Sequence, residues 1–193
     1  MRIDYYDKNA ETFIVDTINI DMSEHYAEFL SFISDNALLL DAGSGSGRDS
    51  LAFKKLGHSV VAIDSSEKMV RSTKLFADVE SIHTTFESYR TDLKFDGIWA
   101  CASLLHVKKE DLVAVLDNFS SILSHKGIIY VSFKYGDRER IKGTRYFNDL
   151  NEELLKKFVQ ETKELTLKKI WVSGDERKSR ISEQWLNGIL CKK

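Results

Sequence analysis

The chain has 193 residues, of which 42% are hydrophobic and 30% are charged, and its formal net charge at pH 7 is −2. These values suit one globular domain with a single core, and they exclude a disordered chain. No apolar run approaches the roughly 20 residues of a membrane-spanning helix, and the polar N-terminus lacks the features of a signal peptide, so we expect a cytoplasmic protein without a membrane partner. With 28 basic against 30 acidic side chains, we predict no nucleic-acid partner.

The N-terminal segment, residues 1–35, places apolar side chains at helical spacing in two groups. One group surrounds Phe13 and the other surrounds Phe29, and a capping segment that includes Asp21 separates them. We therefore predict two short helices here, before a sheet core over residues 36–193, all within a single domain of residues 1–193. The aromatic residues of the first group, with Tyr6, either form a lid over a site or anchor the helix on the core.

A glycine-rich loop follows the first predicted strand, the apolar run at residues 38–40. It reads Asp41-Ala42-Gly43-Ser44-Gly45-Ser46-Gly47 and precedes a predicted helix. Such a loop is typical of an anion or nucleotide site, because glycines let the backbone approach a ligand and the helix N-terminus offers unpaired N–H groups. The spacing is G-x-G-x-G with Arg48 next, which disfavours a dinucleotide fingerprint, and no Gly-Lys-Ser/Thr follows to make a phosphate loop.

The second predicted strand, residues 60–63, ends at an acid, Asp64. A carboxylate at this place can accept hydrogen bonds from both hydroxyls of an adenosine ribose. The loop and the acid together predict a ligand that contains a nucleoside.

Strands and helices continue to alternate toward the C-terminus. We predict a helix at 66–76, strands at 81–83 and 95–100, a helix that ends near Leu123, a strand at 127–133, a helix from Asn151, and strands at 165–172 and 185–190. Only a short polar stretch separates the last two strands, so we expect them to pair antiparallel. The predicted fold is a doubly wound, Rossmann-like α/β domain with a seven-stranded, mostly parallel sheet and an antiparallel C-terminal strand.

Four of these segments resemble sequence motifs of the class I S-adenosylmethionine-dependent methyltransferases, and the resemblance covers nearly the whole chain. The segments are residues 40–47, 62–69, 95–101 and 127–132. The resemblance implies S-adenosylmethionine as cofactor and direct methyl transfer to an acceptor. It also implies cofactor contacts by Asp41, Gly43, Ser44, Gly45 and Gly47 for the methionine part, by Asp64, Ser65 and Met69 for the ribose and adenine, and by Ala100 and Cys101 at the fourth strand.

The adenine contact departs from the pattern of the family. Many members have an acid that accepts from the adenine amino group, where this chain has Thr85-Phe86-Glu87. We predict that Phe86 makes the contact through its backbone.

Substrate contacts are expected outside the cofactor strands, because ligands of open α/β sheets lie beyond the carboxyl ends of the strands. The candidates are Tyr6, His106 after the fourth strand, and Lys134, Tyr135 and Arg145 in the charged segment that follows the fifth strand. His106 is either a catalytic base or a residue that makes a structural hydrogen bond. The charged segment either clamps an anionic or aromatic substrate or is merely solvated, and we interpret the turn at 176–180 as solvated.

The sequence leaves the acceptor open. A small molecule is favoured by the slightly negative charge and by the absence of proline, which excludes the Asn/Asp-Pro-Pro-Tyr/Phe motif of amino-group nucleic-acid methylases. The alternatives are a tRNA or protein methyltransferase with a basic surface assembled by folding, and a noncatalytic S-adenosylmethionine-binding protein. A nicotinamide-dependent oxidoreductase is disfavoured by Arg48. The five histidines show no ligand spacing, so we predict no metal, and we expect a monomer or homodimer.

Overall fold

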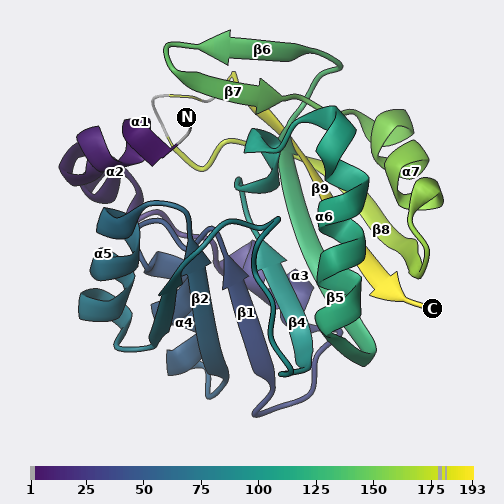
Figure 1. Ribbon diagram of the computed structural model, residues 1–193, viewed down its shortest axis with the longest axis horizontal. Helices are drawn as coiled ribbons and strands as arrows, with labels where there is room; N and C mark the ends of the chain where they lie inside the picture. Colours follow the sequence, from purple (N-terminus) through teal and green to yellow (C-terminus); the bar gives the residue numbers. More distant parts are fainter. Residues whose placement is uncertain (1–2, 178–179, 181) are drawn as a thin grey trace.

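The computed structural model describes residues 3–177, 180 and 182–193, and a seven-stranded sheet lies at its centre. The strands follow the order β3-β2-β1-β4-β5-β9-β8 (Figure 1). Strands β1 to β5 are parallel, and β9 runs antiparallel to both of its neighbours. This sheet confirms the predicted fold. Its strands are β1 (Leu38–Ala42), β2 (Ser59–Asp64), β3 (Glu80–His83), β4 (Phe95–Ala100), β5 (Leu123–Lys134), β8 (Leu165–Gly174) and β9 (Gln184–Lys192).

The strand order changes direction between β1 and β4. From β1 the chain moves outward to β2 and β3, and it then returns to place β4 on the other side of β1. In open α/β sheets the crevice at such a switch point, beyond the carboxyl ends of the strands, is where ligands bind. The topology therefore locates the candidate site at the ends of β1 and β4.

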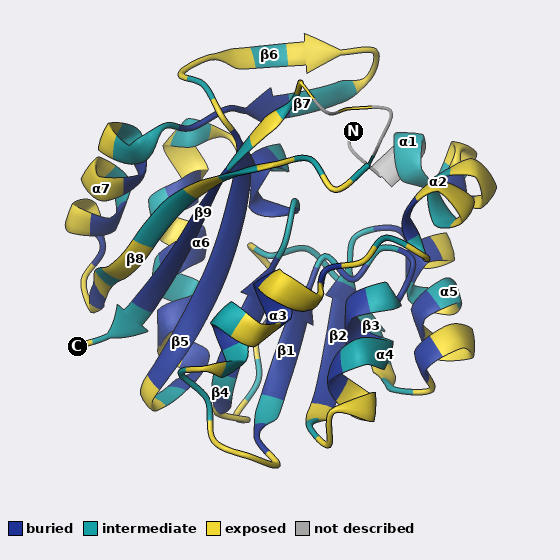
Figure 2. Ribbon diagram, turned by 180° about the vertical axis from the view of Figure 1, so that it is seen from behind, coloured by how far each residue is buried: buried dark blue, intermediate teal, exposed yellow. Residues whose placement is uncertain are grey.

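Helices cover both faces of the sheet, because the central strands are apolar on both sides. Leu39 and Leu40, neighbours on β1, are both fully buried, and they belong to different core clusters. Helices α6 (Lys109–Ile122) and α7 (Glu152–Glu161) cover one face (Figure 1). Helices α3 (Ser23–Leu30) and α4 (Arg48–Lys55) cover the other (Figure 2), and α5 (Glu67–Ala77) packs beside α4 and β3.

The N-terminal segment forms more helices than the two predicted. Helices α1 (Ile3–Lys8) and α2 (Ala10–Thr17) flank Asn9, and α3 follows. The side-chain amide of Asn9 donates to the carbonyl oxygen of Tyr5 at 2.8 Å, and such local side-chain bonds compete with a continuous helix. The break at Asn9 explains why one predicted helix is two.

A two-stranded hairpin was not predicted: we expected a loop between the fifth strand and α7. Strands β6 (Glu139–Lys142) and β7 (Arg145–Asn148) pair antiparallel around a turn at Gly143, whose φ is 63°. A positive φ at the first central position is a feature of two-residue hairpin turns. In Figures 1 and 2 the hairpin stands beyond the end of the sheet at which α1 also lies.

None of the helices in the described part of the chain has the length and apolar character that crossing a lipid bilayer requires.

Candidate active site

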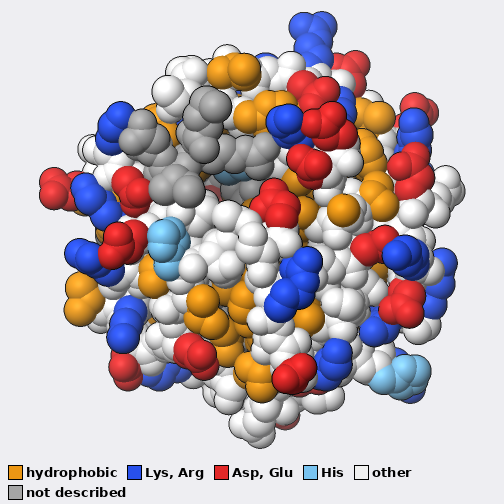
Figure 3. All heavy atoms as spheres, viewed as in Figure 1, with side chains coloured by type: hydrophobic (Ala, Val, Ile, Leu, Met, Phe, Trp, Pro, Cys, Tyr) orange, Lys and Arg blue, Asp and Glu red, His pale blue; other side chains and the backbone are white. Residues whose placement is uncertain are grey.

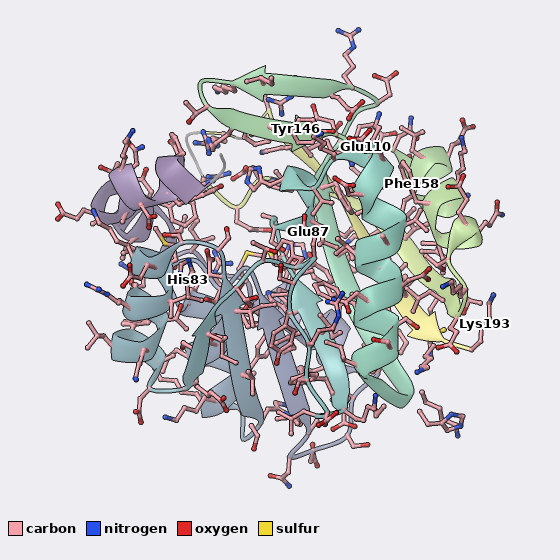
Figure 4. All side chains as sticks on the ribbon, in the orientation of Figure 1. His83, Glu87, Glu110, Tyr146, Phe158 and Lys193 are labelled. Atoms are coloured by element: carbon pink, nitrogen blue, oxygen red, sulfur yellow. The ribbon has the colours of Figure 1, made fainter. Side chains whose placement is uncertain are left out.

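A cavity of about 720 Å³ lies where the carboxyl ends of the parallel strands meet the hairpin and the N-terminal helices. This volume falls within the range of ligand pockets, about 300–1,000 Å³. Its floor comes from the segments that follow β1 to β5, and its roof comes from α1, α2, the hairpin and residues 173–177, 180, 182–185 and 187. Two lining residues are labelled in Figure 4, Glu87 after β3 and Tyr146 on β7.

The structure brings most of the predicted site residues to this cavity. The lining includes Gly43, Ser44, Gly45, Asp64, Ser65, Met69, Phe86 and Cys101 among the predicted cofactor contacts, and Tyr6, His106, Lys134, Tyr135 and Arg145 among the predicted substrate contacts. Asp41, Gly47 and Ala100 do not line it. Asp41 points away and accepts from the Ser50 hydroxyl at 2.5 Å, and burial raises its pKa. Gly47 is the N-cap of α4, with a φ of 88°, and Ala100 is fully buried.

The glycine loop is held tightly against the end of β2. The backbone N–H groups of Gly43 and Ser44 both donate to the carbonyl oxygen of Ile63, at 2.8 and 3.1 Å. Gly43 has a φ of 86°, and a Cβ atom there would lie 2.5 Å from the Cβ of Ser103. Glycine is therefore required at this position both for the backbone conformation and for the close approach of the loop after β4.

Asp64 is the acid at the end of β2. Its Oδ2 accepts from the N–H of Gly45 at 3.0 Å, and its Oδ1 accepts from the N–H of Ser66 at 2.9 Å. Burial raises the pKa of Asp64, and these backbone donors oppose the rise. Each carboxylate oxygen has further acceptor capacity, so the group is held in place while it faces the cavity.

A buried polar cluster under the glycine loop was not predicted. Asp49 accepts from Nε and Nη2 of Arg48 at 2.6 and 2.9 Å, from Nε1 of Trp99 at 2.8 Å, and from the hydroxyl of Tyr26. Burial alone would raise the pKa of Asp49, but Arg48 and the other donors hold it below its ordinary value. Asp49 thus ties α3 and β4 to the start of α4. The only sequence signal was the Arg48-Asp49 pair after the glycines.

His106 bridges the floor and the roof of the cavity. Its Nδ1 lies 2.7 Å from the backbone oxygen of Tyr146 on β7, and its Nε2 lies 2.7 Å from the hydroxyl of Tyr6 on α1. A carbonyl oxygen only accepts, so in the neutral ring Nδ1 carries the hydrogen and Nε2 accepts from Tyr6. Burial raises the pKa of Tyr6, so its hydroxyl stays protonated, although Arg145 beside it opposes part of the rise.

The structure places Lys134 in an ion-pair cluster. Its Nζ lies 3.2 Å from Oδ2 of Asp175, contacts Glu183, and sits 3.8 Å above the centre of the Trp185 ring. Arg177 binds both oxygens of Asp175, at 2.8 and 2.6 Å. The charge of Lys134 is therefore neutralised by protein groups.

The turn at 176–180, interpreted as solvated, contributes to the cavity wall. Glu176, Arg177 and Arg180 line the cavity, and Lys178 lies outside the described residues. The sequence could not show this, since nothing in the turn itself indicates that it folds back over the site.

Tyr135 and Arg145 differ in their surroundings. Tyr135 is exposed at the rim, and its hydroxyl donates to Glu152 at 3.0 Å. Arg145 is half-buried, and its guanidinium lies 4.1 Å from the centre of the Tyr5 ring and 5.1 Å from that of Phe147. The Nε of Arg145 is buried without a hydrogen-bond partner among the described residues.

The outer surface carries charges of both signs. Figure 3 shows Lys, Arg, Asp and Glu side chains interspersed over the face that it presents. Among the described residues, no three His, Cys, Asp or Glu side chains converge as a metal site requires.

Comparison with solved structures identifies the fold. A Burkholderia thailandensis 1,6-didemethyltoxoflavin-N1-methyltransferase, with 1,6-didemethyltoxoflavin and S-adenosylhomocysteine bound, is 19% identical with a TM-score of 0.79, over 99% of this chain and 85% of that one. Magnesium protoporphyrin IX methyltransferase from Synechocystis PCC 6803, with S-adenosylmethionine bound, is 16% identical with a TM-score of 0.71, over 99% and 95%. The cyclase SpnF is 15% identical with a TM-score of 0.75, over 98% and 94%.

The strand order and the likeness to these solved structures show that the chain has the class I methyltransferase fold. Residues 39–127, which run from β1 into β5, match the family model described as a methyltransferase domain. This segment therefore carries the sequence pattern of a methyltransferase domain, in agreement with the resemblance to the class I S-adenosylmethionine-dependent methyltransferases. No curated protein matches the chain.

Proposed function

We propose that the protein transfers the methyl group of S-adenosylmethionine to a small-molecule acceptor bound under the hairpin. The observation that carries the proposal is the arrangement of one cavity. Its floor holds the glycine loop, the carboxylate of Asp64 and His106, and its roof holds Tyr6 and Arg145. One cavity thus offers a nucleoside site and, beside it, a polar and aromatic site.

The floor residues fit the cofactor in shape and in hydrogen bonding. A side chain at Gly43 would fill the cradle that the loop forms with Ser103. The Oγ of Ser103 is buried and has no partner among the described residues, so it can bond to a ligand. Asp64 keeps acceptor capacity on both oxygens for the ribose hydroxyls, and Met69, a buried residue of the lining, would pack against the adenine.

His106 is proposed as the base for the acceptor. When bound, S-adenosylmethionine supplies an electrophilic methyl group on a positively charged sulfur. The protein must hold the acceptor in line with it, and alignment of this kind corresponds to effective molarities of roughly 10⁵–10⁸ M. The carbonyl of Tyr146 fixes the tautomer of His106 and leaves Nε2 as the acceptor of a proton. Because Nε2 accepts from the Tyr6 hydroxyl, that hydroxyl would give its hydrogen to Nε2 and take the proton of an N–H or O–H nucleophile in its place.

A small acceptor is favoured by the roof of the cavity. The hairpin, α1 and described residues between 173 and 187 contribute to the lining. A nucleic-acid or protein acceptor would instead need an open approach to His106 and, for nucleic acid, a basic surface. The solved neighbours with toxoflavin and magnesium protoporphyrin in their names act on small molecules, which agrees with the proposal.

Calorimetric titration with S-adenosylhomocysteine, S-adenosylmethionine and NAD tests the cofactor assignment. We expect micromolar binding of the first two and none of NAD. Methyl transfer is tested separately, by measuring S-adenosylhomocysteine formation with a panel of small phenols, amines and aromatic acids. Binding without any product across the panel would favour a noncatalytic protein or a different reaction on the same fold, as the cyclase SpnF illustrates. No binding to a folded sample would contradict the proposal.

A further inference from the structure

Of the seven described Lys and Arg side chains that line the cavity, five are paired with acids. The pairs are Arg48 with Asp49, Lys134 with Asp175 and Glu183, Arg140 with Asp149, Arg177 with Asp175, and Arg180 with Glu183. Two lining bases have no acid partner among the described residues, namely Lys142 and Arg145. Lys142 is exposed on the outer strand of the hairpin, whereas Arg145 is half-buried. Arg145 is thus a sheltered positive charge of this cavity that no acid among the described residues pairs with, and the Tyr6 hydroxyl beside it is a neutral partner.

Burial makes this charge significant. The Nε of Arg145 is a buried donor that no described group accepts, and an unsatisfied buried donor is costly. The aromatic rings of Tyr5 and Phe147 compensate part of the charge through its cation–π contacts, but a ring face does not accept the in-plane N–H groups. A planar guanidinium with free donors is the side chain best suited to bind a carboxylate through two hydrogen bonds.

The surroundings of Arg145 are aromatic. Phe147 meets the ring of His106 edge to face, with 5.0 Å between the centres, and Tyr6 meets His106 and Phe13 in the same way, at 5.6 and 5.1 Å. These rings, Tyr6, Phe13, His106 and Phe147, all line the cavity. Flat apolar walls of this kind favour a planar ligand.

The hairpin that carries Arg145 is fixed in place. Arg140 on β6 binds both carboxylate oxygens of Asp149, at 2.6 and 3.0 Å, and its guanidinium lies 4.6 Å from the centre of the Phe147 ring. The Nδ1–H of His106 donates to the backbone carbonyl of Tyr146 and so attaches β7 to the segment after β4. The hairpin therefore holds Arg145 in a fixed position, and Phe147 contacts both Arg145 and the proposed base.

From these observations we propose that the acceptor is a planar aromatic acid, whose carboxylate pairs with Arg145 while its ring lies against the aromatic wall. This inference rests on the proposed function and specifies its substrate class. The carboxylate would supply the acceptor that the Nε of Arg145 lacks. An uncharged analogue of the same shape would leave that donor unpaired, which makes the pair a determinant of specificity.

The test is calorimetry on matched ligand pairs, with and without S-adenosylhomocysteine. The probes are hydroxybenzoic and hydroxyquinoline carboxylic acids, each compared with its carboxamide. We expect the acids to bind at least tenfold more tightly than the amides, and Arg145→Gln to abolish the difference. Arg145→Lys should restore part of it, because it keeps the charge without the two-pronged geometry. Arg138→Gln is the matched control, because Arg138 lies just before β6, is 87% exposed in its side chain and is outside the lining.

The outcomes separate the two proposals. Three outcomes would overturn the proposal of an acidic acceptor: equal binding of acids and amides, no binding of any acid, or a preference for acids that survives Arg145→Gln. If S-adenosylhomocysteine still binds in these cases, the proposed function stands. Failure of S-adenosylhomocysteine to bind would instead count against the proposed function, and the acid titration without it would still test the Arg145 site. S-adenosylhomocysteine affinity also reports whether each variant is folded.

Discussion

Nε2 of His106 lies 2.7 Å from the hydroxyl oxygen of Tyr6, although 100 positions separate the two residues in the sequence. This contact joins α1 to the short helix η1 (Leu104–His106) that follows β4. Because Nδ1 of the same ring is bound to the backbone of β7, the imidazole connects the roof to the floor at two points. The orientation of a proposed catalytic group thus depends on the N-terminal segment and on the hairpin.

The first prediction concerns His106. His106→Asn should lower kcat by roughly 10²- to 10⁴-fold for an acceptor with an ionisable N–H or O–H, because the base is lost, and should leave S-adenosylhomocysteine affinity within twofold. The measurement is a steady-state pH profile. The wild type should lose activity on the acid side as the imidazole becomes protonated, and the variant should not show this loss. His125→Asn, at an exposed position in β5, is the control. A variant with normal kcat and an unaltered profile would leave His106 with a structural role only.

The second prediction separates the cost of a positive φ from the cost of a steric clash, by comparing Gly43 with Gly143. Gly43→Ala should nearly abolish S-adenosylmethionine binding, because its Cβ would lie 2.5 Å from that of Ser103 and the φ is 86°. Gly143→Ala shares the positive φ, 63°, but its Cβ would meet nothing within 4 Å, so it should cost only about 1 kcal/mol of stability and no affinity. Calorimetry and thermal unfolding of both variants measure the difference. Equal loss of affinity in both variants would contradict the proposal that the cofactor binds against Gly43.

The third prediction concerns Cys101, which lines the cavity. Burial raises the pKa of its thiol to about 12. At pH 8 only about one thiol in ten thousand would be ionised, and the thiolate is the reactive form. Cys101 should therefore react slowly with an aromatic disulfide reagent, as followed in Cys191→Ser, where it is the remaining cysteine. Rapid modification at pH 8 in the folded protein would show that the thiol is more accessible than the structure indicates.

The fourth prediction concerns stability in acid. Burial opposes ionisation of Asp175, but hydrogen bonds from Arg177 and Trp185 hold its pKa well below its ordinary value. Since the folded pKa is the lower one, the ionised group contributes stability that is complete above the unfolded value of about 3.9 and is lost as pH falls below it. Asp175→Asn should cost roughly 1–3 kcal/mol at pH 7 and show a smaller further loss between pH 4 and 3. Urea unfolding at each pH measures this. If the variant and the wild type lose stability in parallel, Asp175 is not responsible.

The sequence was sufficient for the sheet and for the floor of the cavity. Parallel strands buried on both faces leave continuous apolar runs, as at residues 38–40 and 60–63, and a glycine loop between strand and helix is a local pattern. The position of Asp64 relative to this loop follows from the order of the strands. Local sequence patterns and the order of the strands are therefore enough to predict which segments form the floor of the cavity, without knowledge of long-range contacts.

The roof could not be predicted in the same way. The hairpin strands carry charged residues, such as Glu139 and Lys142, that indicate a loop, and only Gly143 gave a turn signal. The pairing of Lys134 with Asp175 joins residues 41 positions apart, and the sequence near either residue gives no signal of this contact. Sequence reasoning therefore named Lys134 and Arg145 together as substrate contacts, whereas the structure shows that Lys134 is neutralised by acids and that Arg145 is not.

The affinity of S-adenosylmethionine for the wild type and for Asp64→Asn tests the central claim most directly. The account predicts micromolar binding to the wild type and a roughly ten- to a hundredfold weaker affinity for the variant, because hydrogen bonds to a charged acceptor are worth roughly 1.5–3 kcal/mol. Asp78→Asn, at a side chain that is 95% exposed, should bind like the wild type. Equal affinity of Asp64→Asn and the wild type, or no binding to the folded wild type, would contradict the account.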